Sequence, residues 1–475
     1  MFSQKTSNIS IFDAKRNLIS IIAFLLIALM VQIPAFAQEG TRESGEVTSP
    51  ALKDNLYGDP ETRVFEIYLP PSYKTSDKRY PVIYVLHGHG AKPRKELVSP
   101  GGMFNHIKPA MDSMLRDGKI KEMIAVFADG GNKLGGNFYL NSETTGDYET
   151  YITKDLVNYI DANYRTIAER NSRGITGGSM GGYGAMHLAL KYPEIFGAVV
   201  AQGGFYSVEI DGFRESWIFP LASVNATNWS ELEGSFWKNR TALAYISGAC
   251  PNPNKPPFFL DMPCEMVDGK AQIVPEVWQR MKDYDIIHGH LPRYVKNPVK
   301  LNAIMFVHGV TDDVLSVSQA RSLDQALTEL GIEHVYDEHN GGHEFIPEKS
   351  LQFLSEHLSD RPVETGKKST EQGGVTMFAR FTIAQVKSGK MDELAKIYEE
   401  SIVPAAKAQK GYQGAYLLTN PETGKAISIT VWDSEADAIA NEQSGYYQEQ
   451  VAKAKDCFAA PPIREGYEIT VADAK

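Results

Sequence analysis

Short apolar runs alternate with helix-like stretches over most of the chain before residue 360. Strand-like runs are expected at residues 62–68, 81–87, 123–128, 198–201, 303–309 and 333–338. Between them, residues 150–163 carry Ile152, Leu156 and Ile160 at helical spacing, and residues 316–330 form another helix-like stretch. Strands that alternate with helices are typical of a parallel sheet. The pattern therefore predicts an α/β domain with a mostly parallel sheet.

The alternation stops between about Gly203 and Leu301, where the pattern predicts a long irregular insertion. This segment contains Trp217, Trp229, Trp237 and Trp278. Insertions above the ends of sheet strands often wall a substrate pocket. For any single tryptophan, filling a hydrophobic gap beneath a loop is an equally good explanation. We expect the insertion to cover a binding site, and we assign no catalytic role to its tryptophans.

A second, smaller domain is expected at residues 374–475, after a polar linker at residues 361–373, and the first domain is expected to span residues 38–360. The second domain is expected to contain a strand at 377–383, a helix around 394–405, strands at 412–419 and 426–432, a helix from Ser434 and a last strand from Tyr467. The resulting order, β-α-β-β-α-β, is that of a ferredoxin-like α+β fold.

The N-terminal residues have the pattern of a secretory signal. Basic residues, ending with Lys15 and Arg16, precede an apolar run at residues 18–31, and Ala35 and Ala37 give a small-residue cleavage site. The apolar run is shorter than a comfortable bilayer span, although an uncleaved anchor is the alternative. We therefore expect residues 1–37 to be a signal peptide, and the mature chain to be secreted or periplasmic and free of the membrane.

Composition narrows the range of partners. The chain has 475 residues, of which 43% are hydrophobic, and its formal net charge is -11. Nucleic acids and anionic membranes require basic patches, so the charge argues against both as main partners and favours small neutral or cationic substrates. The three cysteines include Cys250 and Cys264, which could form a disulfide in an oxidising compartment. We expect no metal site at the cysteines, because no histidine lies near them in the sequence.

The strongest chemical motif is the run Gly177-Gly178-Ser179-Met180-Gly181, which lies between a strand-like segment and a helix-like run. In a G-x-S-x-G turn the serine adopts a strained backbone conformation, and the flanking positions must lack a Cβ. The turn places the serine hydroxyl at a helix N-terminus, where developing negative charge is favoured. The motif therefore predicts that Ser179 is the nucleophile of an acyl-transfer reaction.

A serine nucleophile requires a histidine base and a carboxylate that orients the histidine. Asp312 follows the predicted strand 303–309, and His343 lies in a glycine-rich loop after the predicted strand 333–338. We expect Asp312 and His343 to complete a triad with Ser179, in the chain order serine, acid, histidine that is typical of α/β-hydrolases. Asp313 is the alternative acid.

Three other histidines are weaker candidates for the base. His308 belongs to the end of a strand, His339 lacks the glycine pair that precedes His343, and His187 lies inside the helix that follows the serine. Packing explains His187 better than catalysis does.

The predicted strand 81–87 ends in a glycine-rich turn, Gly88-His89-Gly90. A tetrahedral intermediate requires about two preorganised hydrogen-bond donors for its oxyanion. We assign this role to the backbone N–H groups of His89 and Met180. The side chain of His89 is expected to be that of a partly exposed loop residue.

Residues 59–357 resemble the putative esterase family of α/β-hydrolases. The family includes feruloyl and acetylxylan esterases, enterobactin esterases, S-formylglutathione hydrolases and mycolyltransferases. The resemblance rests on residues 68–73, on residues 79–88, on residues 151–165 and on the serine turn. It implies an α/β-hydrolase fold, a triad of Ser179, Asp312 and His343, and oxyanion donors at His89 and Met180.

Residues 375–471 resemble the antibiotic-biosynthesis-monooxygenase type of dimeric α/β barrel, through the order of elements and the run 431–435. This segment contains no histidine, so the haem ligation and imidazole chemistry of some relatives are not available to it. The resemblance implies a homodimer formed through sheet faces rather than oxygen chemistry, with Trp432 in the core.

Together these patterns predict a secreted serine carboxylesterase without a cofactor, acting on a small-molecule or carbohydrate-linked acyl or aromatic ester. An acyltransferase of the mycolyltransferase type is one alternative, because an alcohol instead of water can accept the acyl group. A non-catalytic binding protein with the same fold is the other. The triad residues alone separate none of these three hypotheses.

Overall fold

The computed structural model describes residues 39–90, 103–224, 226–233, 236–361, 377–434, 437–439, 441, 446–459 and 462–469. The chain divides into two compact units, residues 1–365 and 366–475. The signal peptide expected at residues 1–37 and all but the first residue of the linker expected at residues 361–373 lie outside the described residues.

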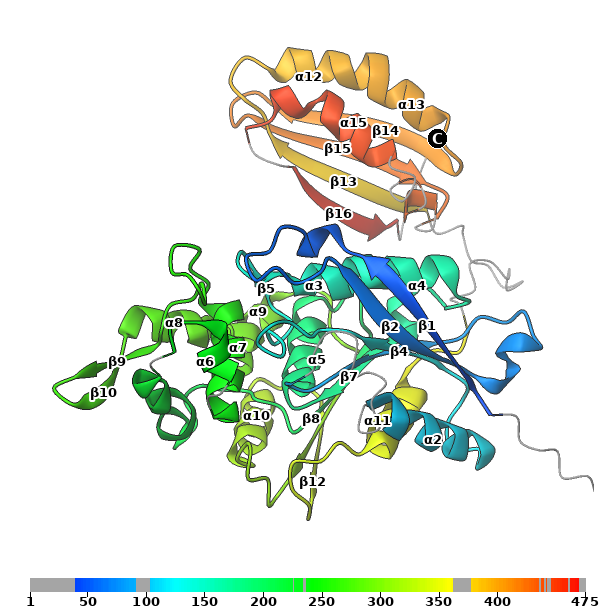
Figure 1. Ribbon diagram of the computed structural model, residues 1–475. Helices are drawn as coiled ribbons and strands as arrows, with labels where there is room; N and C mark the ends of the chain where they lie inside the picture. The colour runs from blue at the N-terminus through cyan, green and yellow to red at the C-terminus, as the bar shows by residue number, and fades with distance from the viewer. Residues whose placement is uncertain are drawn as a thin grey trace, which may run out of the picture. The chain divides into compact units, whose positions relative to one another are not determined.

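The first unit is built on an eight-stranded sheet with the order β1-β2-β4-β3-β7-β8-β11-β12 (Figure 1). Its strands are β1 Thr41–Thr48, β2 Thr62–Leu69, β3 Val82–Leu86, β4 Ile124–Ala128, β7 Arg173–Gly178, β8 Ala198–Gln202, β11 Ala303–Gly309 and β12 Val335–His339. β2 pairs antiparallel with β1 and β4, and all later pairs are parallel. This order and the single reversed strand confirm the predicted α/β-hydrolase fold.

The inner strands of this sheet are buried on both faces, which explains their unbroken apolar runs in the sequence. In β3, Val82, Tyr84 and Leu86 belong to one core, and the alternate residues Ile83 and Val85 belong to the other. Helices α2 and α11 supply the core on one face, while α4, α5 and α10 pack on the opposite face (Figure 1). These helices are α2 Met103–Arg116, α4 Val157–Asn163, α5 Met180–Lys191, α10 Ser318–Glu329 and α11 Pro347–His357.

The helix expected at residues 150–163 is present but is not uniform. A short α3, Tyr148–Thr150, leads into a π-helical segment, Tyr151–Leu156, and α4 completes it. A short antiparallel pair of strands, β5 Asn141–Ser142 and β6 Gly146–Asp147, precedes α3.

The insertion between β8 and β11 is largely helical, so the expectation of an irregular segment was wrong. It contains α6 Trp229–Glu233, α7 Trp237–Ala249, the hairpin β9 Cys264–Val267 and β10 Lys270–Ile273, α8 Pro275–Asp283 and α9 Leu291–Lys296. Residues 241–249 of α7 are all buried. A helix that is buried on every side has no polar face, and the periodic signal that predicts a helix is then missing.

Cys250 and Cys264 are both buried free thiols, so the disulfide considered from the sequence is not formed. Cys250 Sγ donates to Val277 O at 3.5 Å, and Cys264 Sγ donates to Ile218 O at 3.1 Å. Burial raises the pKa of Cys250 to about 12 and that of Cys264 to about 11. Each thiol is therefore held in its neutral form by the insertion.

The second unit is a small α+β fold, as predicted. Its antiparallel sheet has the order β14-β15-β13-β16. The elements are β13 Phe378–Gln385, α12 Met391–Ile397, α13 Val403–Lys407, β14 Tyr412–Asn420, β15 Lys425–Trp432, α15 Tyr446–Lys453 and β16 Ile463–Glu468. The last strand begins at Ile463 and not at Tyr467, because β13 pairs with the whole segment although Arg464 and Gly466 interrupt its apolar pattern.

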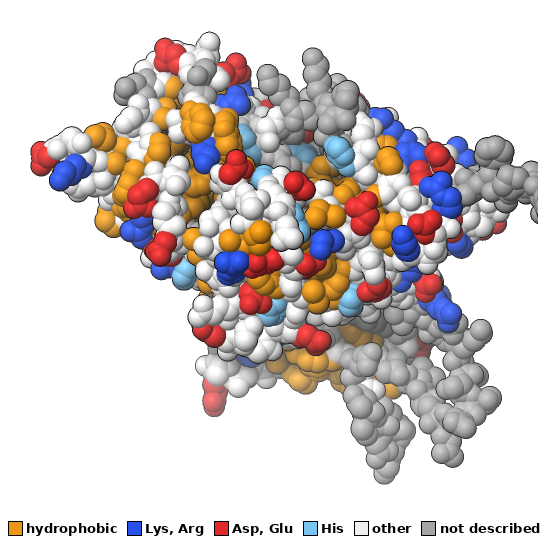
Figure 2. Space-filling model, turned by 90° about the horizontal axis from the view of Figure 1, so that it is seen from below, with side chains coloured by type: hydrophobic (Ala, Val, Ile, Leu, Met, Phe, Trp, Pro, Cys, Tyr) orange, Lys and Arg blue, Asp and Glu red, His pale blue; other side chains and the backbone are white. Residues whose placement is uncertain are grey.

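No helix in the described part of either unit is long and apolar enough to cross a lipid bilayer. On the face shown in Figure 2, acidic and basic side chains are interspersed, with hydrophobic patches between them.

Candidate active site

Ser179 occupies a sharp turn between β7 and α5. Its backbone has φ 59° and ψ -120°, a conformation that costs about 1–3 kcal/mol for a residue with a side chain. The neighbouring glycines make the turn possible. A Cβ on Gly181 would lie 2.1 Å from Leu86 O, and a Cβ on Gly177 would lie 2.4 Å from Gly181 O. The backbone N–H of Ser179 donates to Gln202 O at 2.9 Å, which fixes the turn against β8.

The predicted histidine and acid are in contact. His343 Nδ1 lies 2.7 Å from Asp312 Oδ2, and the Asp312 carboxylate is fully buried while the His343 ring is one-fifth exposed. An ionised carboxylate only accepts hydrogen bonds, so Nδ1 carries the proton. His343 Nε2 is then left with a lone pair, as a general base requires.

Asp312 is held by more than the imidazole. Its Oδ1 accepts from the backbone N–H groups of Val314 and Leu315, each at 2.8 Å, and its Oδ2 lies 3.3 Å from His308 Nε2. Burial acts to raise the pKa of Asp312, but the hydrogen bonds from His308 and His343 outweigh it and hold the pKa well below its usual range. The carboxylate therefore stays ionised beside the imidazole.

Apart from His308, which contacts Asp312, the alternative residues weighed from the sequence do not contact the pair of His343 and Asp312. Asp313 is exposed and makes no contact with His343. His339 accepts a hydrogen bond from Gly341 N, and His187 is fully buried between Glu149 Oε1 at 3.1 Å and His290 Nε2 at 2.8 Å. Burial lowers the pKa of His187, which fits a packed neutral residue.

Ser179 and His343 line the same cavity, together with His89 and Met180. No hydrogen bond joins Ser179 to His343, although both are among the described residues. Catalytic contacts of this kind often tighten only when substrate binds. Gly203 lies against the imidazole, since a Cβ there would be in van der Waals contact with His343 Nδ1 and Cε1 at 3.4 Å, and its φ of +52° favours glycine at this position.

The turn after β3 lies against Ser179, as expected of an oxyanion site. A Cβ on Gly88 would be 3.5 Å from Ser179 Cβ and 4.0 Å from its Oγ. Met180 is the first residue of α5, so its N–H is one of the unpaired donors of a helix N-terminus. The backbone around residues 88–89 and the start of α5 thus approach the serine from two sides.

The cavity beside Ser179 has a volume of about 190 Å³ and is walled mainly by apolar side chains. These include Phe138, Phe205, Phe213, Trp217, Ile218, Trp237, Ala242, Tyr245, Met281, Val314 and Leu315. Phe205 stacks on Phe213 with ring centroids 5.0 Å apart. The Tyr245 hydroxyl donates a hydrogen bond to Met281 O at 2.8 Å, so this polar group of the lining is paired within the protein. Such a pocket accommodates a large apolar group.

The tryptophans of the insertion divide into two groups. Trp217 and Trp237 line the cavity, as the sequence led us to expect of the insertion. Trp229 packs edge-on against Tyr57 at 5.0 Å, and the Trp278 indole donates to Glu209 Oε1 at 3.0 Å, so these two fill the structure away from the cavity.

The sequence analysis missed one supporting residue, Gln202, and considered another, His308, only as a base and not as a partner of Asp312. Gln202 ends β8 and is almost fully buried; its Oε1 accepts from Ile346 N at 2.9 Å, and its Nε2 donates to Ser350 Oγ at 2.7 Å. The backbone carbonyl of Gln202 also accepts a hydrogen bond from the backbone N–H of Ser179. Gln202 therefore joins the serine turn to the segment that follows His343. Their position at the ends of buried strands was the only signal in the sequence.

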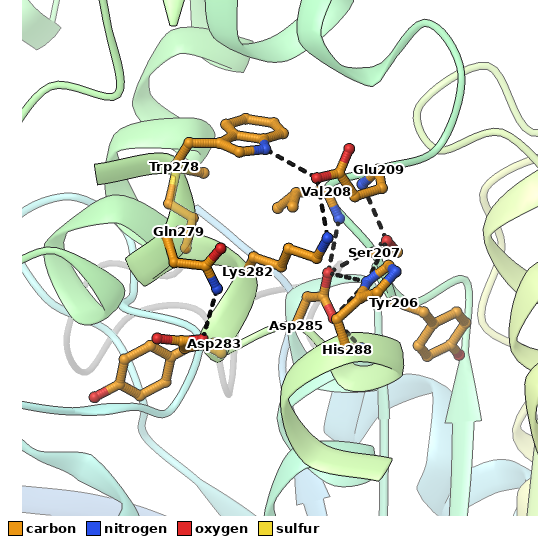
Figure 3. Close-up of polar contacts among 12 residues, drawn as sticks. Tyr206, Ser207, Val208, Glu209, Trp278, Gln279, Lys282, Asp283, Asp285 and His288 are labelled. Carbon is orange, nitrogen blue, oxygen red and sulfur yellow. Dashed lines mark hydrogen bonds and ion pairs between the residues drawn. The ribbon is translucent and has the colours of Figure 1, made fainter. Parts of the chain in front are cut away.

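A second serine, carboxylate and histidine meet inside the insertion but serve a structural purpose (Figure 3). Ser207 Oγ lies 3.2 Å from Asp285 Oδ2 and 3.3 Å from His288 Nδ1, and that same Nδ1 lies 2.9 Å from Asp285 Oδ2. Because serine and aspartate contact the same ring nitrogen, the imidazole cannot pass a proton between them. The cluster fixes the loop that follows Phe205, which is one of the residues lining the cavity.

Among the described residues, no group of three or more histidine, cysteine, aspartate or glutamate side chains is arranged to hold a metal ion. The second unit has its own small cavity between sheet and helices, which includes Arg380, Tyr398 and Trp432. The Trp432 ring is buried, and its indole N–H donates to Thr430 Oγ1 at 3.0 Å. This tryptophan is therefore a core residue, as expected.

Comparison with protein families gives two matches. The family model described as Putative esterase matches residues 60–347, and the one described as Antibiotic biosynthesis monooxygenase matches residues 377–453. An esterase of Mycobacterium tuberculosis is 30% identical over 212 residues, which are 39% of this chain and 43% of the relative. An endo-1,4-beta-xylanase/feruloyl esterase of Xylanibacter ruminicola is 34% identical over 191 residues, 38% of this chain and 25% of the relative. The match thus spans less than half the length of these two relatives.

Solved structures of similar proteins include a ferulic acid esterase, with 20% sequence identity and a TM-score of 0.44 over 67% of this chain and 99% of the other. An S-formylglutathione hydrolase from Agrobacterium tumefaciens has 18% identity and a TM-score of 0.44 over 68% of this chain and 97% of the other.

Proposed function

The chain belongs to the Putative esterase family, and we propose that it is a serine carboxylesterase that works through Ser179, His343 and Asp312. The observation that carries the proposal is the 2.7 Å contact between His343 Nδ1 and Asp312 Oδ2, on the wall of the cavity that also contains Ser179. Family membership supports the reaction class, and the geometry of the site supports the assignment of the three residues.

The mechanism follows from the proton positions. Ser179 Oγ attacks the ester carbonyl while His343 Nε2 takes its proton, and the imidazolium that results is stabilised by the ionised Asp312. The same proton then passes to the leaving alcohol, and an acyl group stays on Ser179. A water molecule repeats the sequence in the second half-reaction, releasing the acid and restoring the serine.

The backbone N–H groups of His89 and Met180 are proposed to hold the oxyanion. Loss of one such donor typically costs about 3 kcal/mol of transition-state stabilisation. The support is the close approach of residues 88–89 to Ser179 and the position of Met180 at the start of α5.

We propose that the acyl group of the substrate is bulky and apolar, with carbohydrate-linked aromatic esters as the best fit. The support is the aromatic lining of the cavity beside Ser179 and the match to a relative named as a xylanase and feruloyl esterase. An acetyl group would leave most of the cavity unfilled, and the apolar surface would contribute little to its binding.

This substrate assignment is tested with a panel of esters that share one alcohol and differ in the acyl group. We expect kcat/KM for an arylpropenoyl ester to exceed that for the acetyl ester by at least about tenfold, because burial of the larger group stabilises the transition state by more than about 1.4 kcal/mol. The variant Ala242→Leu narrows the cavity and should lower kcat/KM for the arylpropenoyl ester while sparing the acetyl ester.

A preference for the acetyl ester would contradict the assignment. Adding a competing alcohol to the same reactions separates hydrolysis from acyl transfer, since a transferase would form the new ester in place of the free acid.

We further propose that the chain is exported, to the periplasm or the medium. The support is the order of basic residues, apolar run and small-residue cleavage site at residues 1–37.

The second unit is proposed to join two copies of the chain through its sheet. The face of the sheet opposite the helices carries Phe381, Ile383, Tyr416, Leu418, Ile427, Ile429, Val431 and Tyr467. The side chains of Tyr416, Leu418 and Tyr467 are half or more exposed. A row of exposed apolar side chains on one sheet face is typical of an interaction surface, and the match to the monooxygenase family supports a second copy as the partner.

The dimer is tested with Leu418→Asp, which places a charge on this face. We expect the wild-type chain to be a dimer by light scattering at micromolar concentration and the variant to be a monomer, because a carboxylate cannot be buried unpaired in the interface. Thr419→Asp is the matched control: it is the next residue of β14, also exposed, and it points to the other face. A wild-type chain that is monomeric would contradict the proposal.

A further inference from the structure

The ring of His89 is partly exposed, as expected of a loop residue, but it is held by two partners. Its Nε2 lies 2.8 Å from Leu134 O, and its Nδ1 lies 2.9 Å from Thr241 Oγ1. A carbonyl oxygen only accepts, so Nε2 must carry the hydrogen when the ring is neutral. Nδ1 is then an acceptor, and the Thr241 hydroxyl must donate to it.

Thr241 belongs to α7 in the insertion, whereas His89 belongs to the turn after β3. The neighbours of Thr241 on α7, Trp237, Ala242 and Tyr245, line the cavity that we assign to the acyl group. A single side-chain hydrogen bond thus connects the wall of the acyl cavity to the turn proposed to bind the oxyanion. The Thr241 hydroxyl also lies 3.0 Å from Trp237 O, so its one hydrogen is shared between the ring and the helix carbonyl.

The rest of the turn is fixed from the other side. Gly90 N donates to Gly135 O at 3.0 Å, and the Tyr139 hydroxyl donates to His87 O at 3.0 Å. These bonds hold residues 87 and 90, on either side of Gly88 and His89. The direction of the His89 backbone N–H depends on how the residue is oriented, and the ring of His89 is anchored to α7.

We propose that Thr241 is a positioning residue for the oxyanion site: its hydroxyl anchors the His89 ring and so aims the His89 backbone N–H at the substrate oxygen. This inference rests on the proposed esterase function. An oxyanion donor is effective only if it is oriented before charge develops, because reorientation during the reaction costs the stabilisation it provides. The insertion therefore sets reactivity as well as acyl fit.

The His89 ring stays neutral at the pH values at which another imidazole can act as a base. Burial lowers the pKa of His89 to about 4, and the nearby charges of Arg240 and His87 act in the same direction. The hydrogen bond in which Nδ1 accepts from Thr241 is thus preserved at neutral pH.

The test compares Thr241→Val, which keeps the shape and removes the hydroxyl, with Thr241→Ser, which restores it. For Thr241→Val we expect kcat to fall about tenfold for acetyl and arylpropenoyl esters alike, with KM nearly unchanged, since a misdirected donor weakens only the transition state. Thr241→Ser should recover kcat to within about threefold. The affinity for a boronic acid, which forms a tetrahedral adduct on the serine, should fall in parallel with kcat.

Thr153→Val is the matched control. Thr153 is also a buried helical threonine that donates to the carbonyl four residues earlier, at 2.7 Å, and it lies outside the cavity. We expect its kinetics to equal those of the wild type. An unchanged kcat in Thr241→Val, or a rise in KM that grows with the size of the acyl group, would overturn the inference. A different result would contradict the proposed function itself: ester hydrolysis by the wild type that does not depend on Ser179.

Discussion

Replacing Ser179 by alanine is expected to lower kcat for ester hydrolysis by at least about 10⁴-fold, the loss typical of removing the nucleophile of a triad. The reason is that water must then attack the ester directly, aided only by the oxyanion donors and by binding. KM should change little, because the alanine leaves the apolar cavity intact. The measurement is hydrolysis of a chromogenic ester by the wild type and the variant at equal concentration.

The control for this experiment is Ser172→Ala. Ser172 is a fully buried serine just before β7, the strand that leads to Ser179, and its hydroxyl has no hydrogen-bond partner among the described residues. We expect this variant to keep the activity of the wild type. A fluorophosphonate probe should label Ser179 in the wild type and in Ser172→Ala, but not in Ser179→Ala. Equal and slow product release by the wild type and Ser179→Ala would leave a binding protein as the better description.

The second large effect is expected for Asp312→Asn, a loss of about 10⁴-fold in kcat. Asparagine has an NH2 group in place of one carboxylate oxygen, so it cannot accept hydrogen bonds at both positions as the carboxylate does. Oδ1 of Asp312 accepts from two backbone N–H groups, so the amide nitrogen would face His343 and favour the tautomer with its proton on Nε2. That tautomer cannot accept the serine proton. The measurement is the pH profile of kcat/KM for both forms of the enzyme.

Asp313→Asn removes the same charge one residue away and is the natural comparison. Asp313 is exposed, so we expect its replacement to change kcat by less than about threefold. The opposite ranking of the two variants would make Asp313 the triad acid. Because the folded-state pKa of Asp312 is depressed, its contribution to stability is present above its unfolded-state pKa of about 3.9 and is lost as pH falls below that value. Activity assays near neutral pH therefore test catalysis and not acid unfolding.

The sheet and the order of the site residues were accessible from the sequence for a physical reason. A strand buried on both faces, such as Val82–Leu86, must be apolar without interruption, and a strained serine must be flanked by glycines. The α7 helix was missed because burial on all sides removes the alternation that marks a helix. Gln202 was missed because it acts through contacts between segments far apart in the chain, and spacing along the sequence carries no record of such contacts. His308 was considered only as a base, and its contact with Asp312, four residues later, was not foreseen.

The ring of His89 is the most instructive case. Its backbone could be assigned from the strand and glycine turn, but its side chain was expected to be unremarkable. The partner, Thr241, lies 152 positions later on the helix that the sequence failed to predict. A residue's role can therefore be hidden when its neighbour belongs to an element without a recognisable pattern.

The insertion between β8 and β11 supplies much of the cavity wall but none of the three residues proposed for the triad, which follow β7, β11 and β12. Grafting the equivalent segment of another esterase in its place is therefore expected to change the acyl preference and to leave the three residues proposed for the triad in position. If Thr241 acts as proposed, the graft succeeds only when the incoming segment presents a hydroxyl to His89. Chimaeras that lack it would bind their new substrate well and turn it over slowly.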